Sequence, residues 1–231
     1  MRIWKGRFPV WRYEGSFSIR SYAGDYRYHN EILWRGREGF LSGYIIFNLR
    51  KDDLNKSMKI REAELRDLDE LMKFYKKMCE FLGRKSFLPN GNKGGFPSRK
   101  MVEDAIQQHD QFIGEEDGRI MAAYIMDHEC DQIYDTVQWQ IKADRNEIMI
   151  LHALRVLPEY AGRGYSKKLV EHAIQRAKAQ RQRAIRLDCI EGNDVPQKMY
   201  MSFGFHYIDT VEITYADVGV PRKFLVFELL L

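Results

Sequence analysis

The chain has 231 residues, of which 45% are hydrophobic and 30% charged, and its formal net charge is +4, a composition typical of a globular protein. No apolar run approaches the roughly 20 residues that span a bilayer, and the N-terminal residues lack the apolar core of a signal peptide. We therefore expect a cytoplasmic protein that does not enter a membrane. Cys79, Cys130 and Cys189 lie far apart, without the spacing of metal-binding pairs, so neither a disulfide framework nor a metal site is expected.

Residues 1–57 differ from the rest of the chain in charge and aromatic content. They hold 11 Lys and Arg against 6 Asp and Glu, and 12 of the 30 aromatic residues, including Trp4, Trp11 and Trp34. Basic residues interleaved with aromatic ones can bind nucleic acid. No RNA-binding signature is present, however, and residues 28–49 predict two or three short strands joined by glycine turns. We expect a basic, aromatic-rich extension with a structural role, and keep contact with RNA or a protein partner as an alternative.

From Met58 to Leu231 the pattern predicts one mixed α/β domain. Residues 58–64 alternate like a strand, and apolar residues at helical spacing between 65 and 82 predict a helix that stops at Gly83. A glycine-rich loop leads to Ser98, which can cap a short helix, and the Asp117-Gly118 pair predicts a hairpin turn. Further strands are predicted at residues 147–156, 184–192, 206–216 and 223–231, with helices within 157–179 and 195–204.

Two glycines precede the amphipathic helix that ends at Ala179. Its apolar face would pack on a sheet, which leaves the N-terminus of the helix able to face a ligand. Glycine lets backbone N–H groups converge, and a helix N-terminus favours negative charge. The N–H groups that could bind a diphosphate belong to Gly162, Arg163, Gly164, Tyr165 and Ser166. A plain tight turn is the alternative interpretation of this stretch.

Pro158 predicts an opening between two strands. It has no N–H and holds Leu157 in an extended conformation, so we expect the strand before it to stop pairing with the next strand at that point. The gap would expose backbone groups that an amide-bearing arm could bind as though it were an added strand. A diphosphate with an amide arm describes coenzyme A.

Two motifs in this region resemble the GNAT family of N-acetyltransferases, and the order of elements from Met58 to Leu231 is similar to that of the family. The family's pyrophosphate motif, [QR]-x-x-G-x-[GA], falls on residues 161–166. Ala161 stands at the Gln/Arg position, Gly164 at the glycine and Ser166 at the final small residue. Downstream, N-x-x-A-x-x-x-Y-x-x-x-G-F is matched by Asn193, Tyr200, Gly204 and Phe205, with Pro196 in place of the alanine.

This resemblance implies a mixed, mostly antiparallel sheet with a splayed strand pair, flanked by helices. It also implies acetyl transfer from acetyl-CoA to a primary amine of a small molecule, amino acid or peptide, by direct attack in a ternary complex and without a metal. Within the site, it implies that the Leu154 N–H stabilises the oxyanion and that Val156 and Asn193 hold the pantetheine arm. Tyr200 would donate the proton to the departing sulfur, and a tyrosine packed under the sheet is the alternative.

Several groups are candidates for the general base that takes the proton from the amine. Residues 151–156 are similar to the histidine-bearing strand of the arylalkylamine N-acetyltransferases, where His152 falls on one of two histidines and Ile150 on the other position. A structural histidine is the alternative, with Asp127, Glu147 or a water chain as other proton acceptors. Loops 86–96 and 127–139 fall where the family builds its acceptor pocket, and their aromatic and acidic residues suit a cationic amine.

Two further alternatives stay open at this point. One is a non-catalytic sensor or regulatory module that binds acyl-CoA. Ala161 favours this alternative, because it stands where the family pattern has Gln or Arg. The other concerns assembly, where a homodimer is the alternative to a single chain.

Overall fold

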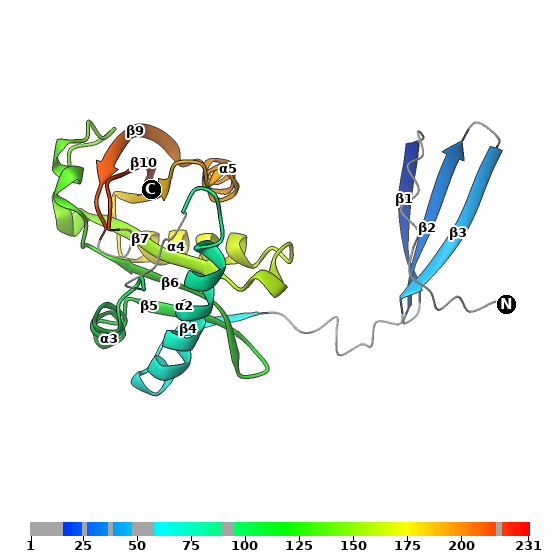
Figure 1. Ribbon diagram of the computed structural model, residues 1–231, viewed down its shortest axis with the longest axis horizontal. Helices are drawn as coiled ribbons and strands as arrows, with labels where there is room; N and C mark the ends of the chain where they lie inside the picture. The colour runs from blue at the N-terminus through cyan, green and yellow to red at the C-terminus, as the bar shows by residue number, and fades with distance from the viewer. Residues whose placement is uncertain (1–15, 25–26, 37–38, 48–57, 89–94, 216–218) are drawn as a thin grey trace. The chain divides into compact units, whose positions relative to one another are not determined.

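The structure of the protein, a computed structural model, describes residues 16–24, 27–36, 39–47, 58–88, 95–215 and 219–231. The chain divides into two compact units, Met1–Ser57 and Met58–Leu231 (Figure 1). In the first unit an antiparallel sheet has the order β1-β2-β3, with bounds β1 (Ser16–Gly24), β2 (Arg27–Gly36) and β3 (Gly39–Phe47). This confirms the predicted strands between residues 28 and 49. Trp4 and Trp11 lie outside the described residues.

The second unit is built on a seven-stranded sheet of order β4-β5-β6-β7-β8-β10-β9. The strands are β4 (Lys59–Glu62), β5 (Gln111–Glu116), β6 (Arg119–Asp127), β7 (Ile148–Val156), β8 (Ala184–Ile190), β9 (His206–Ile213) and β10 (Arg222–Leu230). Neighbouring strands run antiparallel except β7 and β8, which run parallel. The predicted mixed, mostly antiparallel sheet is confirmed.

Local signals explain where several elements begin and end. Helix α2 (Leu68–Leu82) follows a short 3-10 turn and ends at Gly83 as predicted. Helix α3 (Arg99–Gln107) is capped by Ser98, whose Oγ accepts a hydrogen bond from the Met101 N–H. Asp117 and Gly118 adopt the positive φ angles, 51° and 72°, of the predicted hairpin turn.

Helices α4 (Tyr165–Ala179) and α5 (Asp194–Ser202) follow β7 and β8. Helix α5 ends at Ser202, before the predicted Gly204, because the N–H groups of Phe203 and Phe205 both bond the Tyr200 carbonyl and close the last turn. Gly204, at φ 89°, then turns the chain into β9.

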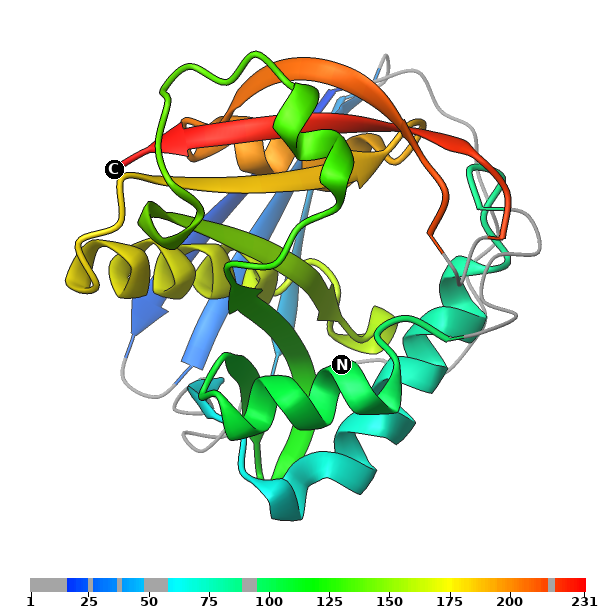
Figure 2. The ribbon, with the colours of Figure 1, turned by 90° about the vertical axis from the view of Figure 1, so that its left-hand side faces the viewer.

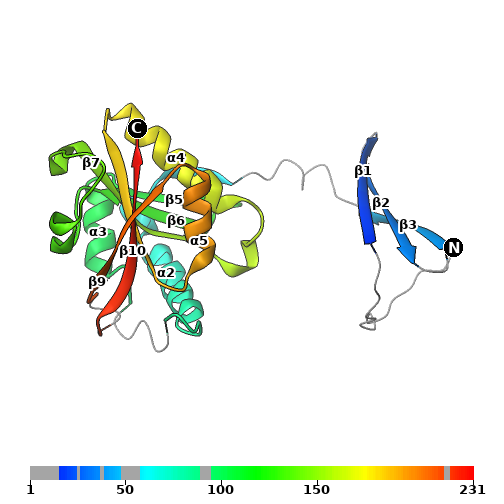
Figure 3. The same ribbon diagram turned by 90° about the horizontal axis from the view of Figure 1, so that it is seen from above.

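The helices cover both faces of the sheet. Helices α2 and α3 lie on one face, which Figure 2 shows in front, and α4 lies behind it; in Figure 3, β5 and β6 lie between α2 and α4. On the α4 face the predicted apolar side of the helix is buried, through Leu169, Val170, Ala173 and Ala177. On the other face Leu71, Phe74, Tyr75 and Met78 of α2 form a second core cluster. These two layers hold β7 between them.

Strands β7 and β8 pair over a short length and then separate. Their pairing covers only Ile148–Ile150 and Ala184–Arg186, after which the strands diverge (Figure 2). The prediction that pairing ends at Leu157 because of Pro158 was therefore wrong. Leu157 still donates its N–H to the Met121 carbonyl, so β7 keeps its pairing with β6 to the very end.

A β-bulge in β7 lies at the start of the opening. His152 is opposite Ile125 and Arg155 is opposite Ala123, so Ala153 and Leu154 together face one residue of β6. Ala153 has φ 49°, which is unusual for a residue with a side chain. A bulge bends its strand and increases the local twist, which accounts for the divergence of β7 from β8.

Candidate active site

A cavity of about 310 Å³ lies where β7 and β8 diverge. Its apolar wall comes from α2, α3 and the loop between them, through Leu82, Phe87, Leu88, Phe96 and Met101. Its polar residues come from β7, β8, α5 and the segment after β6, and include Glu129, Asp131, His152, Arg155, Asp188, Asn193 and Tyr200. Loops 86–96 and 127–139 thus both reach the cavity, and residues 89–94 of the first lie outside the described residues.

The two glycines before α4 hold a backbone conformation that other residues avoid. Gly162 and Gly164 have φ 79° and 77°, and a Cβ at either position would meet nothing within 4 Å. The glycines are therefore required by backbone conformation and leave open space above the turn. Gly164 is the N-cap residue of α4 and supplies no capping side chain, so the first N–H groups of the helix find no acceptor among the described residues.

Basic side chains surround this turn. The Arg163 guanidinium lies 5.0 Å from the Tyr160 ring centre, and the Lys168 ammonium lies 5.9 Å from that of Tyr165. Ala161 is exposed and contributes only its backbone, and Tyr165 is buried by its ring while Ser166 is partly exposed. Converging N–H groups, a helix N-terminus and local positive charge together suit an anion.

Beyond the bulge, the N–H groups of β7 alternate between β6 and the gap. Since the Leu157 N–H bonds Met121 on β6, the Val156 N–H points to the opposite side, toward the gap. Continued to Leu154, which belongs to the bulge, this alternation predicts that its N–H also faces the gap. Both side chains pack against the core cluster on the α4 face. The structure therefore places the Val156 N–H along the open edge of β7, and the oxyanion role of the Leu154 N–H stays a prediction.

His152 is held by hydrogen bonds on one side of its ring. Its Nε2 lies 3.0 Å from Asp127 Oδ1 and 2.9 Å from the Glu129 carbonyl oxygen, and 17% of its side chain is exposed. Because both neighbours accept hydrogen bonds, the neutral ring carries its proton on Nε2 and its lone pair on Nδ1. Burial lowers the pKa of His152, but the hydrogen bond and charge of Asp127 outweigh burial, so its pKa is raised.

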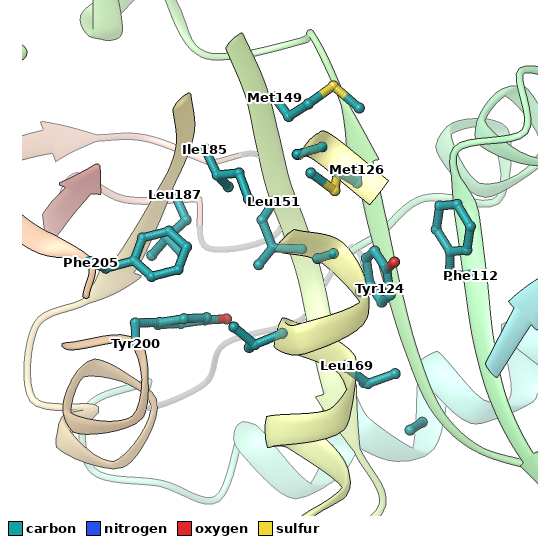
Figure 4. Packing of buried hydrophobic residues seen from close by; sticks show 14 of the residues in the cluster. Phe112, Tyr124, Met126, Met149, Leu151, Leu169, Ile185, Leu187, Tyr200 and Phe205 are labelled. Atoms are coloured by element: carbon teal, nitrogen blue, oxygen red, sulfur yellow. The ribbon is translucent and has the colours of Figure 1, made fainter. Parts of the chain in front are cut away.

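Tyr200 projects from α5 into the space between the diverging strands. Its ring packs edge-on against Phe205 at 5.5 Å, and Figure 4 shows its hydroxyl end directed toward β7. The side chain is 6% exposed and lines the cavity. Burial, and to a lesser degree the neighbouring Cys189, raises the pKa of Tyr200 well above its ordinary value, so the hydroxyl keeps its proton at neutral pH.

Asn193 also reaches the cavity from the start of α5. It is the N-cap residue of the helix, yet its side chain makes no capping hydrogen bond. Its amide group is therefore available on the β8 side of the gap.

Asp188 of β8 is a site residue that sequence reasoning missed. Its Oδ2 accepts hydrogen bonds from the hydroxyls of Tyr134, at 2.9 Å, and Tyr215, at 2.8 Å. Burial raises the pKa of Asp188, although the two tyrosine hydrogen bonds oppose this shift. Ile150 pairs with Arg186, so His152 and Asp188 occupy equivalent positions two residues further along the diverging strands. The predicted strand at residues 184–192 contains Asp188, but its position opposite His152 depends on the register of the two strands.

Of the alternative bases, Asp127 contacts His152, whereas Glu147 is held elsewhere. The Glu147 carboxylate accepts hydrogen bonds from the Asp144 N–H and from Arg183, and it does not line the cavity.

Among the described residues, no group of three or more His, Cys, Asp or Glu side chains is arranged to hold a metal ion. No helix in the described ranges is long and apolar enough to cross a membrane.

The layered sheet, the diverging strands and the turn before α4 together define an acyl-CoA N-acyltransferase fold. The acetyltransferase (GNAT) family model matches residues 84–205, more than half of the chain, and the chain belongs to this family. No curated protein matches the sequence significantly.

Solved structures show the same fold at low sequence identity. A GNAT family acetyltransferase from Streptococcus agalactiae is 19% identical, with a TM-score of 0.59, and the match covers 76% of this chain and 98% of that one. A putative acetyltransferase from Staphylococcus aureus is 21% identical with a TM-score of 0.54, covering 74% and 97%. The ribosomal-protein-S18-alanine N-acetyltransferase from Escherichia coli is 16% identical with a TM-score of 0.54, covering 75% and 94%.

Proposed function

We propose that the protein transfers an acetyl group from acetyl-CoA to a primary amine by direct attack in a ternary complex. The observation that supports this most strongly is the cavity at the gap between β7 and β8. His152 approaches it from the face covered by α2 and α3, and Tyr200 approaches it from the face covered by α4. An acceptor and an acyl donor can therefore meet in the gap from opposite faces of the sheet.

The residues present fit acetyl-CoA, which would supply the activated acetyl group. The N–H groups of residues 162–166 would bind the diphosphate at the α4 N-terminus, where two positive-φ glycines leave open space. Ala161 would contribute its N–H without the side chain that the family pattern has. The Val156 backbone on β7 and the Asn193 side chain on α5 would hold the amide arm from the two sides of the gap.

His152 would act as the general base through Nδ1. An amine that is an ammonium ion at neutral pH must lose a proton before it can attack a carbonyl carbon. The Nδ1 lone pair is the proton acceptor, while the Nε2–H bond to Asp127 fixes the tautomer and stabilises the ring once it is positively charged. Asp127 is thus a positioning residue for the base.

Leu154 and Tyr200 would stabilise the negative charge that develops on the acyl donor, at its carbonyl oxygen and its departing sulfur. The Leu154 N–H would point to the open edge of β7 and donate a hydrogen bond to the carbonyl oxygen as it becomes negative. The Tyr200 hydroxyl, which keeps its proton at neutral pH, would donate that proton to the departing sulfur.

Cys189 lines the same cavity, but its chemistry supports direct attack over an acyl-enzyme. Burial raises the pKa of the Cys189 thiol well above its ordinary value. The nucleophile of an acyl-cysteine mechanism is the thiolate, which this environment disfavours. A protonated thiol beside Tyr200 is a packing group.

Replacement of Gly164 with valine is expected to weaken acetyl-CoA binding by about 10-fold or more. A β-branched residue is strained at φ 77°, so the turn must move and its N–H groups lose their convergence, each charge-assisted hydrogen bond being worth about 1.5–3 kcal/mol. Calorimetric titration with acetyl-CoA measures the effect. Gly118→Val is the matched control, because Gly118 has φ 72° and open space but lies in the β5–β6 turn. Equal affinities in the parent and both variants would refute the diphosphate site.

A chain shortened to residues 58–231 is expected to fold and to retain acetyl transfer. We propose that residues 1–57 form a separate extension, because residues 58–231 form a compact unit by themselves and the described residues that line the cavity belong to that unit. The solved structures also match only about three quarters of this chain. Thermal unfolding and acetyl transfer would be measured on the shortened and full-length chains. Loss of cooperative unfolding after shortening would show that residues 1–57 complete the core.

A screen of primary amines with acetyl-CoA tests the proposed function, with thiol release as the readout and mass spectrometry of the product as confirmation. Binding of acetyl-CoA without thiol release for any amine would favour the acyl-CoA sensor instead. Such a sensor keeps the diphosphate site before α4 but does not transfer the acetyl group.

A further inference from the structure

Arg155 is a positively charged residue that lines the cavity and has no hydrogen-bond or ion-pair partner in the described part of the chain. It lines the cavity, its Nε is buried without a hydrogen bond, and its guanidinium makes no hydrogen bond or ion pair with any described residue. The buried Arg186 shows the usual arrangement, with Glu228 Oε1 at 2.9 Å, the Ile141 carbonyl oxygen at 3.1 Å and the Trp139 ring at 4.2 Å. An unpaired guanidinium is costly to bury, and water exclusion by a ligand increases that cost.

The bulge in β7 brings Arg155 to the same face of the sheet as His152. Cross-strand partners point to the same face, and Arg155 is opposite Ala123, which packs in the core cluster under α2 and α3. His152 is opposite Ile125, two residues further along β6 and therefore on that same face. In a regular strand, residues 152 and 155 would point to opposite faces. The extra residue at Ala153 puts both side chains into one cavity.

The cavity is therefore polarised along β7. Asp188 lies across the gap from His152 and is held there by the hydroxyls of Tyr134 and Tyr215. Glu129 and Asp131 also line this end, so negative charge gathers where the amine must lose its proton. Arg155 provides positive charge three residues further along the strand, toward α2. The same cavity also has the apolar wall formed by α2, α3 and the loop between them.

We propose that Arg155 binds the carboxylate of the acceptor, and that the acceptor is a free amino acid with an apolar side chain. The inference rests on the proposed function and names its substrate class. The amino group lies at the His152 and Asp188 end, the carboxylate accepts hydrogen bonds from the Arg155 guanidinium, and the side chain lies on the apolar wall of Phe87, Leu88, Phe96 and Met101. A planar guanidinium binds a carboxylate through two parallel hydrogen bonds, which fixes the orientation of the acceptor.

Matched pairs of acceptors test the role of Arg155 in the full-length protein. L-phenylalanine is compared with phenethylamine and L-leucine with isoamylamine, since the members of each pair differ only in the carboxylate. The parent is expected to show a kcat/KM for the amino acid about 10- to 100-fold above that for the amine, the range of a charge-assisted hydrogen bond. Arg155→Met is expected to remove this preference by lowering kcat/KM for the amino acid, with little change for the amine.

Two controls separate recognition from folding. Arg119→Met removes an exposed arginine from the β5–β6 hairpin and is expected to leave the preference intact. Because Arg155 has no partner to lose, the thermal midpoint of Arg155→Met is expected to equal or exceed that of the parent. A clearly lowered midpoint with equal losses for both members of each pair would show a structural role and overturn the inference.

Other results would also contradict it. Equal kcat/KM for amino acids and their decarboxylated amines in the parent would exclude carboxylate recognition. A weaker affinity for acetyl-CoA in Arg155→Met, with the acceptor preference unchanged, would assign Arg155 to the acyl donor. If no compound is acetylated, the proposed function fails, and calorimetric titration of L-phenylalanine into the protein with coenzyme A still tests Arg155. Binding that Arg155→Met abolishes would support the inference, and no binding to the parent would refute it.

Discussion

Tyr200→Phe is expected to lower the maximal rate of acetyl transfer by about 100-fold, or about 2.7 kcal/mol of activation free energy, while acetyl-CoA affinity stays nearly constant. The substitution keeps the ring that packs against Phe205 and removes only the hydroxyl. That hydroxyl makes no hydrogen bond with a described residue, so its loss leaves no buried group without a partner. Stability is therefore expected to change little, and the effect should fall on the chemical step.

Steady-state rates at saturating acetyl-CoA and calorimetric affinities separate these quantities. Tyr207→Phe is the matched control, because Tyr207 is an exposed tyrosine of β9 away from the cavity. A Tyr200→Phe rate within twofold of the parent would remove the acid role and leave Tyr200 as a packing residue of the α4 face.

His152→Ala is expected to lower kcat/KM by about 10²- to 10⁴-fold near neutral pH, the range of a positioned general base. The parent should show an acid limb in its profile of kcat/KM against pH, because the base works only when His152 is neutral. Since Asp127 raises the pKa of His152, this limb should lie above the ordinary histidine value of 6.5. In His152→Ala the limb should disappear. The His206→Ala variant, which removes an exposed histidine of β9, should keep it.

Asp127→Asn provides a readout that a purely structural histidine would not give. Without the carboxylate, burial is the largest remaining effect on the imidazole and lowers its pKa, while Asp188 and the hydrogen bond to the Glu129 carbonyl oppose it only in part, so the acid limb should move to lower pH while the plateau rate falls. An unmoved limb in both His152→Ala and Asp127→Asn would contradict the base assignment and favour a water chain.

The same interaction also affects stability in a defined direction. Because the folded-state pKa of His152 is raised, the pairing with Asp127 stabilises the fold fully below the ordinary pKa of 6.5. That contribution is lost as the pH rises through the folded-state pKa. The difference in unfolding free energy between the parent and Asp127→Asn should therefore be larger at pH 5.5 than at pH 8.5.

Local signals in the sequence predicted most of the fold. The Ser98 cap, the Gly83 stop and the Asp117-Gly118 turn act within a few residues, and each lies where it was expected. The opening between β7 and β8 was predicted from Pro158, a local cause, and was misplaced. Its origin is a bulge at Ala153, an alanine in the left-handed region, and no residue-level preference predicts such a conformation.

The candidate site also contains residues that the sequence predicted and residues that it did not. The glycines, Asn193 and Tyr200 were found because they follow motifs along the chain, and their roles stay predictions. Asp188 and Arg155 carry no motif. The position of Asp188 in the site depends on the parallel register of β7 and β8. The position of Arg155 depends on a one-residue bulge, which decides the face of the sheet to which its side chain points. Such long-range geometry is absent from a single sequence.

Transfer of an acetyl group from acetyl-CoA to an amine held beside His152 can be followed from both products of the reaction. The most direct test incubates the full-length protein with acetyl-CoA and a panel of primary amines and amino acids, and quantifies coenzyme A release and N-acetyl product together. We expect release and product in equal amounts for at least one acceptor, strongly reduced in Tyr200→Phe and His152→Ala. Intact-protein mass spectrometry should show no acetylated protein when the acceptor is omitted. Acetyl-CoA binding with neither product nor release for any acceptor would contradict acetyl transfer by this protein.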